Sequence, residues 1–175
     1  MMTKHPKGLP YIVGNEAAER FSYYGMKAIL VVFMTSYLMD RAGARSVMTE
    51  GEATFWYHIF GMANYVVPVF GALIADALWG KYRTIILLSL VYCLGHLSLA
   101  IDDTRLGLGF GLALIAIGSG GIKPCVSAHL GDQYQHEDVA HRSEGYSLFY
   151  IAINLGAFLS TLATPLLLEL SLIHI

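Results

Sequence analysis

The stretch that decides the fold is GNEAAERFSYYGMKAILVVFMTSYLMD, residues 14–40. Its second half is a nearly uncharged apolar run of the kind that crosses a lipid bilayer as a helix. Its first half contains four ionisable side chains, Glu16, Glu19, Arg20 and Lys27. Such groups are costly in a bilayer and usually face a cavity or pathway, which favours a functional interpretation. The alternative is a solvated helix end, with the glutamates at the level of the lipid headgroups.

The spacing of these polar residues indicates one helix face. Residues four apart in sequence lie above one another on a helix. The pairs at this spacing are Glu16 and Arg20, Glu19 and Tyr23, and Tyr23 and Lys27. The polar stripe therefore continues beyond the first turns, which argues against a merely solvated end.

Composition points the same way. Apolar residues make up 55% of the chain and charged residues 14%, and the mean hydropathy is +0.55, which is typical of a membrane protein. The net charge of −2 gives no basic surface for nucleic acid, so we expect no nucleic-acid partner. We find no phosphate loop, no metal-ligand cluster and no catalytic set, and we expect no cofactor.

Four further runs lack Asp, Glu, Lys and Arg, and each approaches or exceeds the roughly 20 residues that cross a bilayer. They are residues 53–75, 84–101, 106–122 and 145–168. We therefore predict an all-α, polytopic membrane protein with about five transmembrane helices. The predicted spans are about 9–39, 53–76, 82–101, 106–128 and 145–169.

The connecting stretches indicate orientation and domain organisation. Basic residues are slightly more frequent on the side that holds the N-terminus, so we predict a cytoplasmic N-terminus, residues 1–8. We expect residues 9–170 to form part of a transmembrane bundle. The odd number of spans predicts an N-terminal fragment, and residues 171–175 (SLIHI) resemble translated adapter sequence, so we expect a non-native tail. Small residues make one face of the fourth span suitable for close helix packing: Gly107, Gly111, Gly118, Gly120 and Gly121.

Polar residues recur in the later spans. His58, Met62 and Tyr65 share a face of the second span, although a lone histidine is often a core residue. Lys123 ends an apolar run directly before a proline, where it either snorkels to the interface or serves a site. Asn154 either bonds a neighbouring helix or holds an amide of a ligand.

Four segments of the sequence resemble the signature motifs of a known transporter family, and they occur in the same order. The segment EAAERFSYYG resembles the ExxERFxYYG signature of proton-dependent oligopeptide transporters, a branch of the major facilitator superfamily. GALIADALWGKYRT resembles the superfamily's loop between its second and third helices. GSGGIKPCVSAHLGDQY and FYIAINLGAF resemble the family's fourth- and fifth-helix signatures.

The resemblance implies helices one to five of an N-terminal six-helix bundle in the cell membrane. It implies proton-coupled symport of di- and tripeptides, with the proton as coupling ion. The expected partners are these peptides, the lipid bilayer and a C-terminal bundle that the sequence lacks.

The resemblance also assigns roles to residues. The residues that match proton-coupling positions are Glu16, Glu19 and His58. Those that match substrate-binding positions are Arg20, Tyr23, Tyr24, Tyr65, Lys123 and Asn154. Those that match the gating or loop motif are Asp76, Gly80, Lys81 and Arg83.

These assignments fit the chemistry of the ligand. A zwitterionic peptide needs a cation for its carboxylate, which Arg20 and Lys123 supply, and uphill transport needs a group that binds a proton. We predict that both cations form an exchangeable ion-pair network with Glu16 and Glu19, between the first and fourth helices.

Three alternatives remain. A related carrier of nitrate or another small solute is possible, because other branches of the family carry these. A membrane binding module without transport is a second class. An enzyme is a third, but Ser119 lacks the GxSG spacing of intramembrane serine proteases and has no evident histidine partner, so we predict that the protein is not an enzyme.

Overall fold

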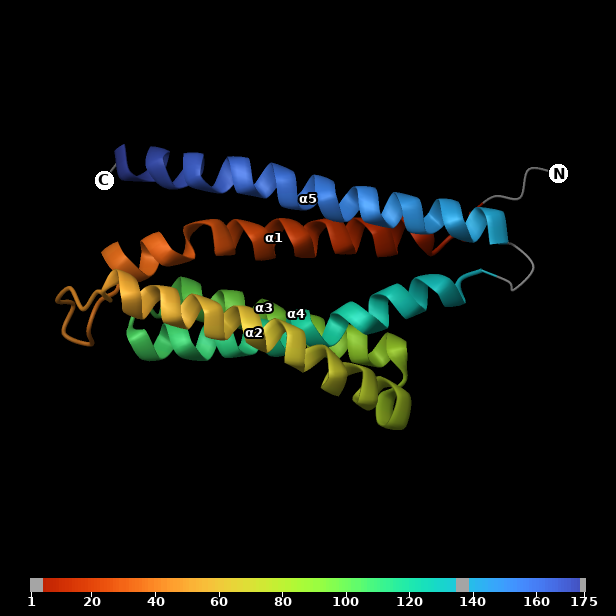
Figure 1. Ribbon diagram of the computed structural model, residues 1–175, viewed down its shortest axis with the longest axis horizontal. Helices are drawn as coiled ribbons and strands as arrows, with labels where there is room; N and C mark the ends of the chain where they lie inside the picture. Colours follow the sequence, from red (N-terminus) through yellow and green to blue (C-terminus); the bar gives the residue numbers. More distant parts are fainter. Residues whose placement is uncertain (1–4, 135–138, 174–175) are drawn as a thin grey trace. The chain divides into compact units, whose positions relative to one another are not determined.

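The structure is a computed structural model that describes residues 5–134 and 139–173 (Figure 1). Residues 1–4 of the predicted cytoplasmic N-terminus and residues 174–175 of the predicted tail lie outside the described residues. Within the described ranges the chain is helical, as predicted. The elements are α1 (Leu9–Ser36), α2 (Glu50–Ile74), the π-helical turn η1 (Ala75–Trp79), α3 (Lys81–Ile101), α4 (Arg105–Asp132) and α5 (Val139–Ile173).

Four helical segments of the described chain are long and apolar enough to cross a membrane. They are Glu50–Trp79, Lys81–Ile101, Arg105–Asp132 and Val139–Leu170. The charged helix α1 has 28 residues, which is also long enough to span a bilayer core. It ends at Ser36, so residues 37–39 of the first predicted span lie beyond it. There the amide of Met39 donates to the carbonyl of Asp103 at 3.1 Å, because the chain has already turned into the connection to α2.

The helices fall into two compact units. The first unit comprises the described residues up to 29 and those from 127 onward, and so contains most of α1 and all of α5. The second unit comprises residues 30–126, with α2, η1, α3 and most of α4.

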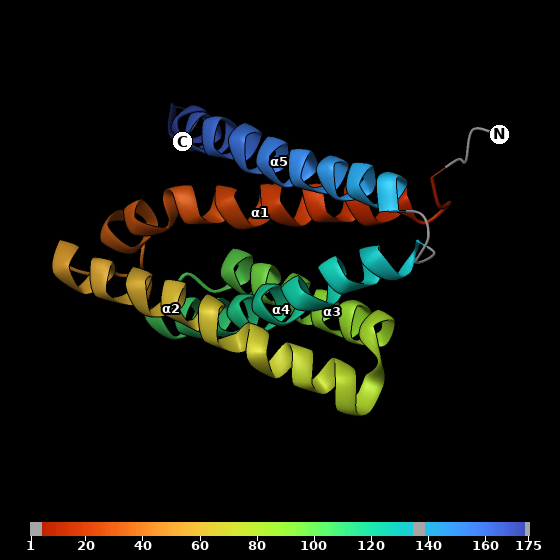
Figure 2. The same ribbon diagram turned by 45° about the vertical axis from the view of Figure 1, so that its right-hand side comes forward.

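In the first unit, α5 runs along α1 (Figures 1 and 2). The two helices approach closely where both carry small residues. Gly156 lies against the backbone of Ala17, and Gly25 lies against Ser160 and Thr164. Small residues allow helix backbones in a membrane to pack at short distance.

The second unit is held together through glycines of α4, as the sequence predicted. Gly121 faces Gly71 of α2, Gly111 faces Gly95 of α3, and Gly118 lies over the backbone of Tyr92. Gly120 similarly packs on Val67. Gly107 differs, because it faces the side chain of Asp102 in the connection that precedes α4.

Helix boundaries in the second unit follow from local chemistry. Thr49 caps α2, since its hydroxyl accepts from the amide of Glu52 at 3.2 Å, as the side chain of an N-cap residue does. Gly80 separates η1 from α3 with φ 74° and ψ 158°, a backbone conformation that is essentially restricted to glycine. Between α3 and α4, hydrogen bonds from the hydroxyl and amide of Thr104 lower the pKa of Asp102.

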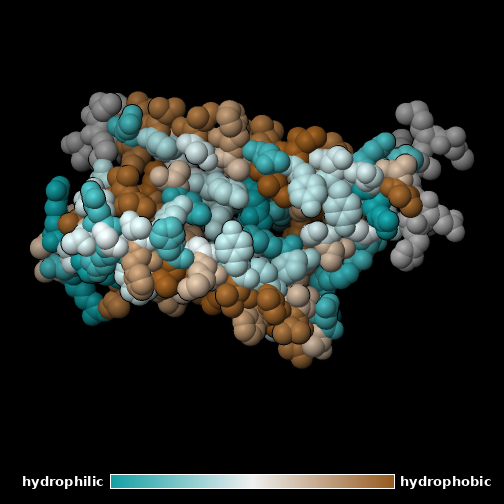
Figure 3. Space-filling model, in the orientation of Figure 1, coloured by the Kyte–Doolittle hydropathy of each residue, from teal (hydrophilic) through white to brown (hydrophobic). Residues whose placement is uncertain are grey.

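The outward surface of α5 is apolar. Figure 3 shows a band of hydrophobic residues where this helix lies. The large apolar side chains of α5 that are more than half exposed include Ile151, Phe158 and Leu162. An exposed apolar helix face of this size fits a lipid environment or another membrane helix.

Candidate functional site

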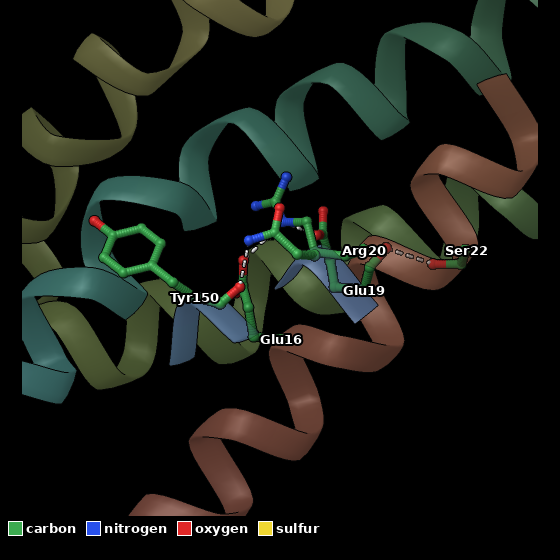
Figure 4. A network of polar contacts seen from close by, with 6 residues as sticks. Glu16, Glu19, Arg20, Ser22 and Tyr150 are labelled. Atoms are coloured by element: carbon green, nitrogen blue, oxygen red, sulfur yellow. Dashed lines mark hydrogen bonds and ion pairs between the residues drawn. The ribbon is translucent and has the colours of Figure 1, made fainter. Parts of the chain in front are cut away.

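The most distinctive site of the first unit is a buried charge cluster on α1. Glu16, Glu19 and Arg20 have exposed fractions of 3%, 8% and 7%. The Arg20 Nε atom lies 2.7 Å from Glu16 Oε1 and 3.0 Å from Glu19 Oε2 (Figure 4). The pair with Glu16 spans one helical turn, as the spacing in the sequence predicted. Buried ions of this kind are stable only when they are paired.

The guanidinium of Arg20 has hydrogen-bond donors besides Nε. Both of its ion pairs use Nε, and a guanidinium carries four more N–H donors on Nη1 and Nη2. A planar pair of such donors matches the two oxygens of a carboxylate. The outer edge of Arg20 therefore has the donor arrangement that a carboxylate requires.

The cluster contains two carboxyl groups and one guanidinium, at positions that are almost fully buried. Removing water from a charge is expensive, so each member needs an opposite charge or a hydrogen-bond partner within the protein.

Two tyrosines follow the cluster along α1. Tyr23 is buried with 4% exposure, and Tyr24 is 37% exposed. Their rings meet edge to face with centroids 5.3 Å apart. Of the two, Tyr24 offers more surface to a ligand, and the sequence did not distinguish them.

Asn154 is an exposed residue of α5. Its Nδ2 donates to the carbonyl of Tyr150 on the same helix at 2.8 Å. This bond holds the amide against its own helix, and the predicted role of Asn154 in substrate binding stays a prediction.

The predicted residues of α2 lie in the second unit and share an exposed face. His58 is exposed, while Met62 and Tyr65 are 58% and 85% exposed. The His58 ring contacts Tyr57 edge to face at 5.7 Å. The placement of His58 differs from that of a core histidine, which was the alternative interpretation of the sequence.

Lys123 is half-buried in α4 and belongs to the second unit. The structure therefore describes the ion pairs of Arg20 with Glu16 and Glu19. The participation of Lys123 in the predicted network stays a prediction.

The loop-motif residues cluster around the junction of η1 and α3. Asp76 lies in the first turn of η1, and Lys81 and Arg83 begin α3. Asp76 and Arg83 are exposed, and Lys81 is half-buried. Gly80 lies between η1 and α3 and makes the turn that joins them.

Sequence reasoning missed Asn64 in α2. Its side chain is 4% exposed, and Nδ2 donates to the carbonyl of Phe60 at 2.8 Å. Its Oδ1 atom is buried without a hydrogen-bond partner among the described residues. The only signal in the sequence was its spacing of four residues from Phe60, which many packing residues share.

Other kinds of site are less developed in the described ranges. A cavity of about 550 Å³ lies in the second unit. Its lining includes Trp56 and Phe110 and the exposed ion pair of Arg105 and Glu52, at 2.7 Å. Among residues 5–134 and 139–173, no group of three or more His, Cys, Asp or Glu side chains could hold a metal ion.

The fold and the cluster together define a class. Long apolar helices joined by short connections, with buried ionisable groups on one helix, are typical of a polytopic membrane protein that moves a polar solute.

Comparison with known proteins gives the family. Residues 82–170 match the POT family. The chain is 43% identical over 174 residues to Solute carrier family 15 member 2 of Danio rerio, covering 94% of this chain and 23% of that protein. It is 44% identical over 171 residues to Peptide transporter family 1 of Drosophila melanogaster, covering 93% of this chain and 22% of that protein.

A solved structure agrees with the sequence relatives. The crystal structure of the POT family transporter PepTSo superposes with a TM-score of 0.86 at 42% identity, over 95% of this chain and 33% of PepTSo. The chain belongs to the POT family. It is thus part of a family of multi-pass membrane transporters and not of enzymes. The chain spans 23% and 22% of the two sequence relatives and 33% of PepTSo.

Proposed function

We propose that this chain forms the N-terminal part of a proton-coupled symporter of di- and tripeptides. The observation that carries the proposal is the buried cluster in which Arg20 Nε pairs with both Glu16 and Glu19. The name of the Drosophila relative, Peptide transporter family 1, supports peptides as the substrate class.

Peptide recognition rests on the outer edge of Arg20. The terminal carboxylate of a peptide accepts two parallel hydrogen bonds from Nη1 and Nη2. Lys123 adds a second cation, and Tyr23, Tyr24, Tyr65 and Asn154 offer polar groups to the peptide amides. Varied side chains are accommodated because these contacts involve the peptide backbone.

Proton coupling in this proposal runs through the two glutamates. While both are ionised they compete with a peptide carboxylate for Arg20. When one glutamate takes up a proton, it stops holding Arg20 and the peptide carboxylate can take its place. Release of the proton restores the competition, so the two ligands bind in a linked way. His58 is a second candidate for a proton site on the exposed face of α2.

We place the protein in the cell membrane with its N-terminus in the cytoplasm. Alternating access requires two bundles that rock about a site between them. Residues 9–170 would then act with a C-terminal bundle that supplies the other half of the peptide site.

The test uses a chimera in which this chain replaces the matching part of the Drosophila relative, to which it is 44% identical. In proteoliposomes, an inward proton gradient should drive saturable uptake of a labelled dipeptide, and a protonophore should abolish accumulation. Arg20→Gln should remove accumulation and strongly weaken peptide binding, because the carboxylate then loses the two parallel hydrogen bonds of the guanidinium. A chimera that takes up nitrate in place of dipeptide would favour the alternative carrier.

A further inference from the structure

We infer that Gly156 is a positioning residue, which holds α5 against the turn of α1 that carries Arg20 and thereby sets the place of the guanidinium. This inference deepens the proposed function and rests on it for the peptide part.

The first step is the contact itself. A Cβ atom added at Gly156 would lie 2.5 Å from the carbonyl oxygen of Ala17 and 3.3 Å from the amide nitrogen of Phe21. Both partners are backbone atoms, which cannot rotate away as a flexible side chain can. The 2.5 Å distance is about 0.9 Å short of the 3.4 Å at which ordinary van der Waals contact begins.

The second step is where the contact falls. Ala17 and Phe21 are joined by the i to i+4 hydrogen bond of an α-helix. The ion pair of Glu16 and Arg20 spans the same turn, one residue earlier at each end. Gly156 therefore touches the backbone segment from which the charged side chains extend.

The third step is the scale of the disturbance. A methyl group at residue 156 displaces α5 or the α1 turn by roughly 1 Å, and a shift of that size at a binding or reacting group is enough to cost a large factor in function. Asn154 lies two residues before Gly156 on α5, so the same shift changes the place of its amide relative to Arg20.

The chain contains a matched control in the same helix pair. A Cβ at Gly25 would meet the Thr164 hydroxyl at 2.6 Å and Ser160 Cβ at 3.5 Å. These are side-chain atoms, two turns away from Ala17, and the Thr164 hydroxyl can rotate. Gly25→Ala thus perturbs the packing of α1 against α5, but the added methyl group does not contact the helix turn that carries Arg20. A Cβ at Gly14 has nothing within 4 Å, so Gly14→Ala controls for helix propensity.

The experiment records the Nε–H resonance of Arg20 by NMR in the full 175-residue chain, labelled at arginine and reconstituted in nanodiscs. Arg20→Lys assigns the signal. We expect Gly156→Ala to shift this resonance and to speed exchange of the Phe21 amide, while Gly25→Ala and Gly14→Ala leave both at their wild-type values. Retained helical circular dichroism shows that the variant is folded. If it is not, the same measurements are made on Gly156→Ala within the chimera described above, where the rest of the relative's chain supports these helices.

A transport measurement then links the position to peptide. In the chimera, Gly156→Ala should raise the KM for dipeptide roughly 10-fold with a smaller change in maximal rate, and Gly25→Ala should stay within about 2-fold. An unshifted Arg20 resonance in folded Gly156→Ala, or an equal shift in Gly25→Ala, overturns the positioning role. Failure of the unmodified chimera to take up dipeptide overturns the proposed function instead, while the NMR result still decides the role of Gly156.

Discussion

The substitution Glu19→Gln separates proton coupling from peptide binding. Glu19 Oε2 lies 3.0 Å from Arg20 Nε, and the side chain is 8% exposed. An amide has the same shape as the carboxylate but carries no charge and binds no proton at accessible pH. Arg20 keeps its 2.7 Å pair with Glu16, so no charge of this cluster is left without a partner, and the fold should persist.

The expected magnitude is worked out for one proton that moves with each peptide through Glu19. A gradient of about one pH unit then provides about 1.4 kcal/mol, which sustains roughly tenfold accumulation. Glu19→Gln leaves a side chain that is permanently neutral, as if protonated. Its accumulation ratio should therefore fall from about 10 to about 1.

The assay compares two modes of transport by the chimera in proteoliposomes with the membrane potential clamped. Glu19→Gln should lose gradient-driven accumulation of labelled dipeptide and keep gradient-free counterflow near the wild-type rate. Lys123→Ala should impair both modes, because the peptide carboxylate loses a cation. Glu50→Gln, an exposed position in the first turn of α2, should change neither. Accumulation by Glu19→Gln to the wild-type level would refute coupling through this residue.

Three further outcomes are expected. The 175-residue chain alone, in proteoliposomes with an inward proton gradient, should show no saturable uptake of dipeptide, since one bundle provides no second gate; gradient-dependent uptake contradicts this. In the chimera, His58→Ala should reduce proton-driven uptake more than peptide affinity, because an imidazole can bind and release a proton and a methyl group cannot; equal loss of both marks a packing residue. Gly80→Ala should destabilise the chain by about 1–3 kcal/mol in thermal unfolding, because φ 74° and ψ 158° strain any other residue; Gly61→Ala, where a Cβ meets nothing within 4 Å, serves as its control.

Local spacing made much of the fold and part of the site predictable. Runs free of charged residues locate α2 to α5, because a bilayer-spanning helix tolerates few charges in its interior. The ion pair of Glu16 and Arg20 was predictable because a helix fixes the distance between residues four apart. The exposed face shared by His58 and Tyr65 follows from the same periodicity.

Features that depend on two segments were not predictable in this way. The sequence does not say that Arg20 pairs with both glutamates through Nε, because side-chain rotamers depend on the surroundings. It does not separate buried Tyr23 from half-exposed Tyr24, which are adjacent. The buried amide of Asn64 was missed for the same reason, since its burial is decided by the helices that pack on α2.

The contact of Gly156 with Ala17 shows how a residue without polar atoms can shape a polar site. Glycine within FYIAINLGAF carries no chemistry that a search for ligands would select. Its constraint comes from the 2.5 Å that separates a hypothetical Cβ from the Ala17 carbonyl, a distance that exists only once α5 lies on α1. The charged side chains of Glu16 and Arg20 extend from α1 and pair within that helix. The position of their helix turn depends on α5, where Gly156 has no side chain. A substitution at such a position should therefore alter ligand affinity while every charged group remains in the sequence.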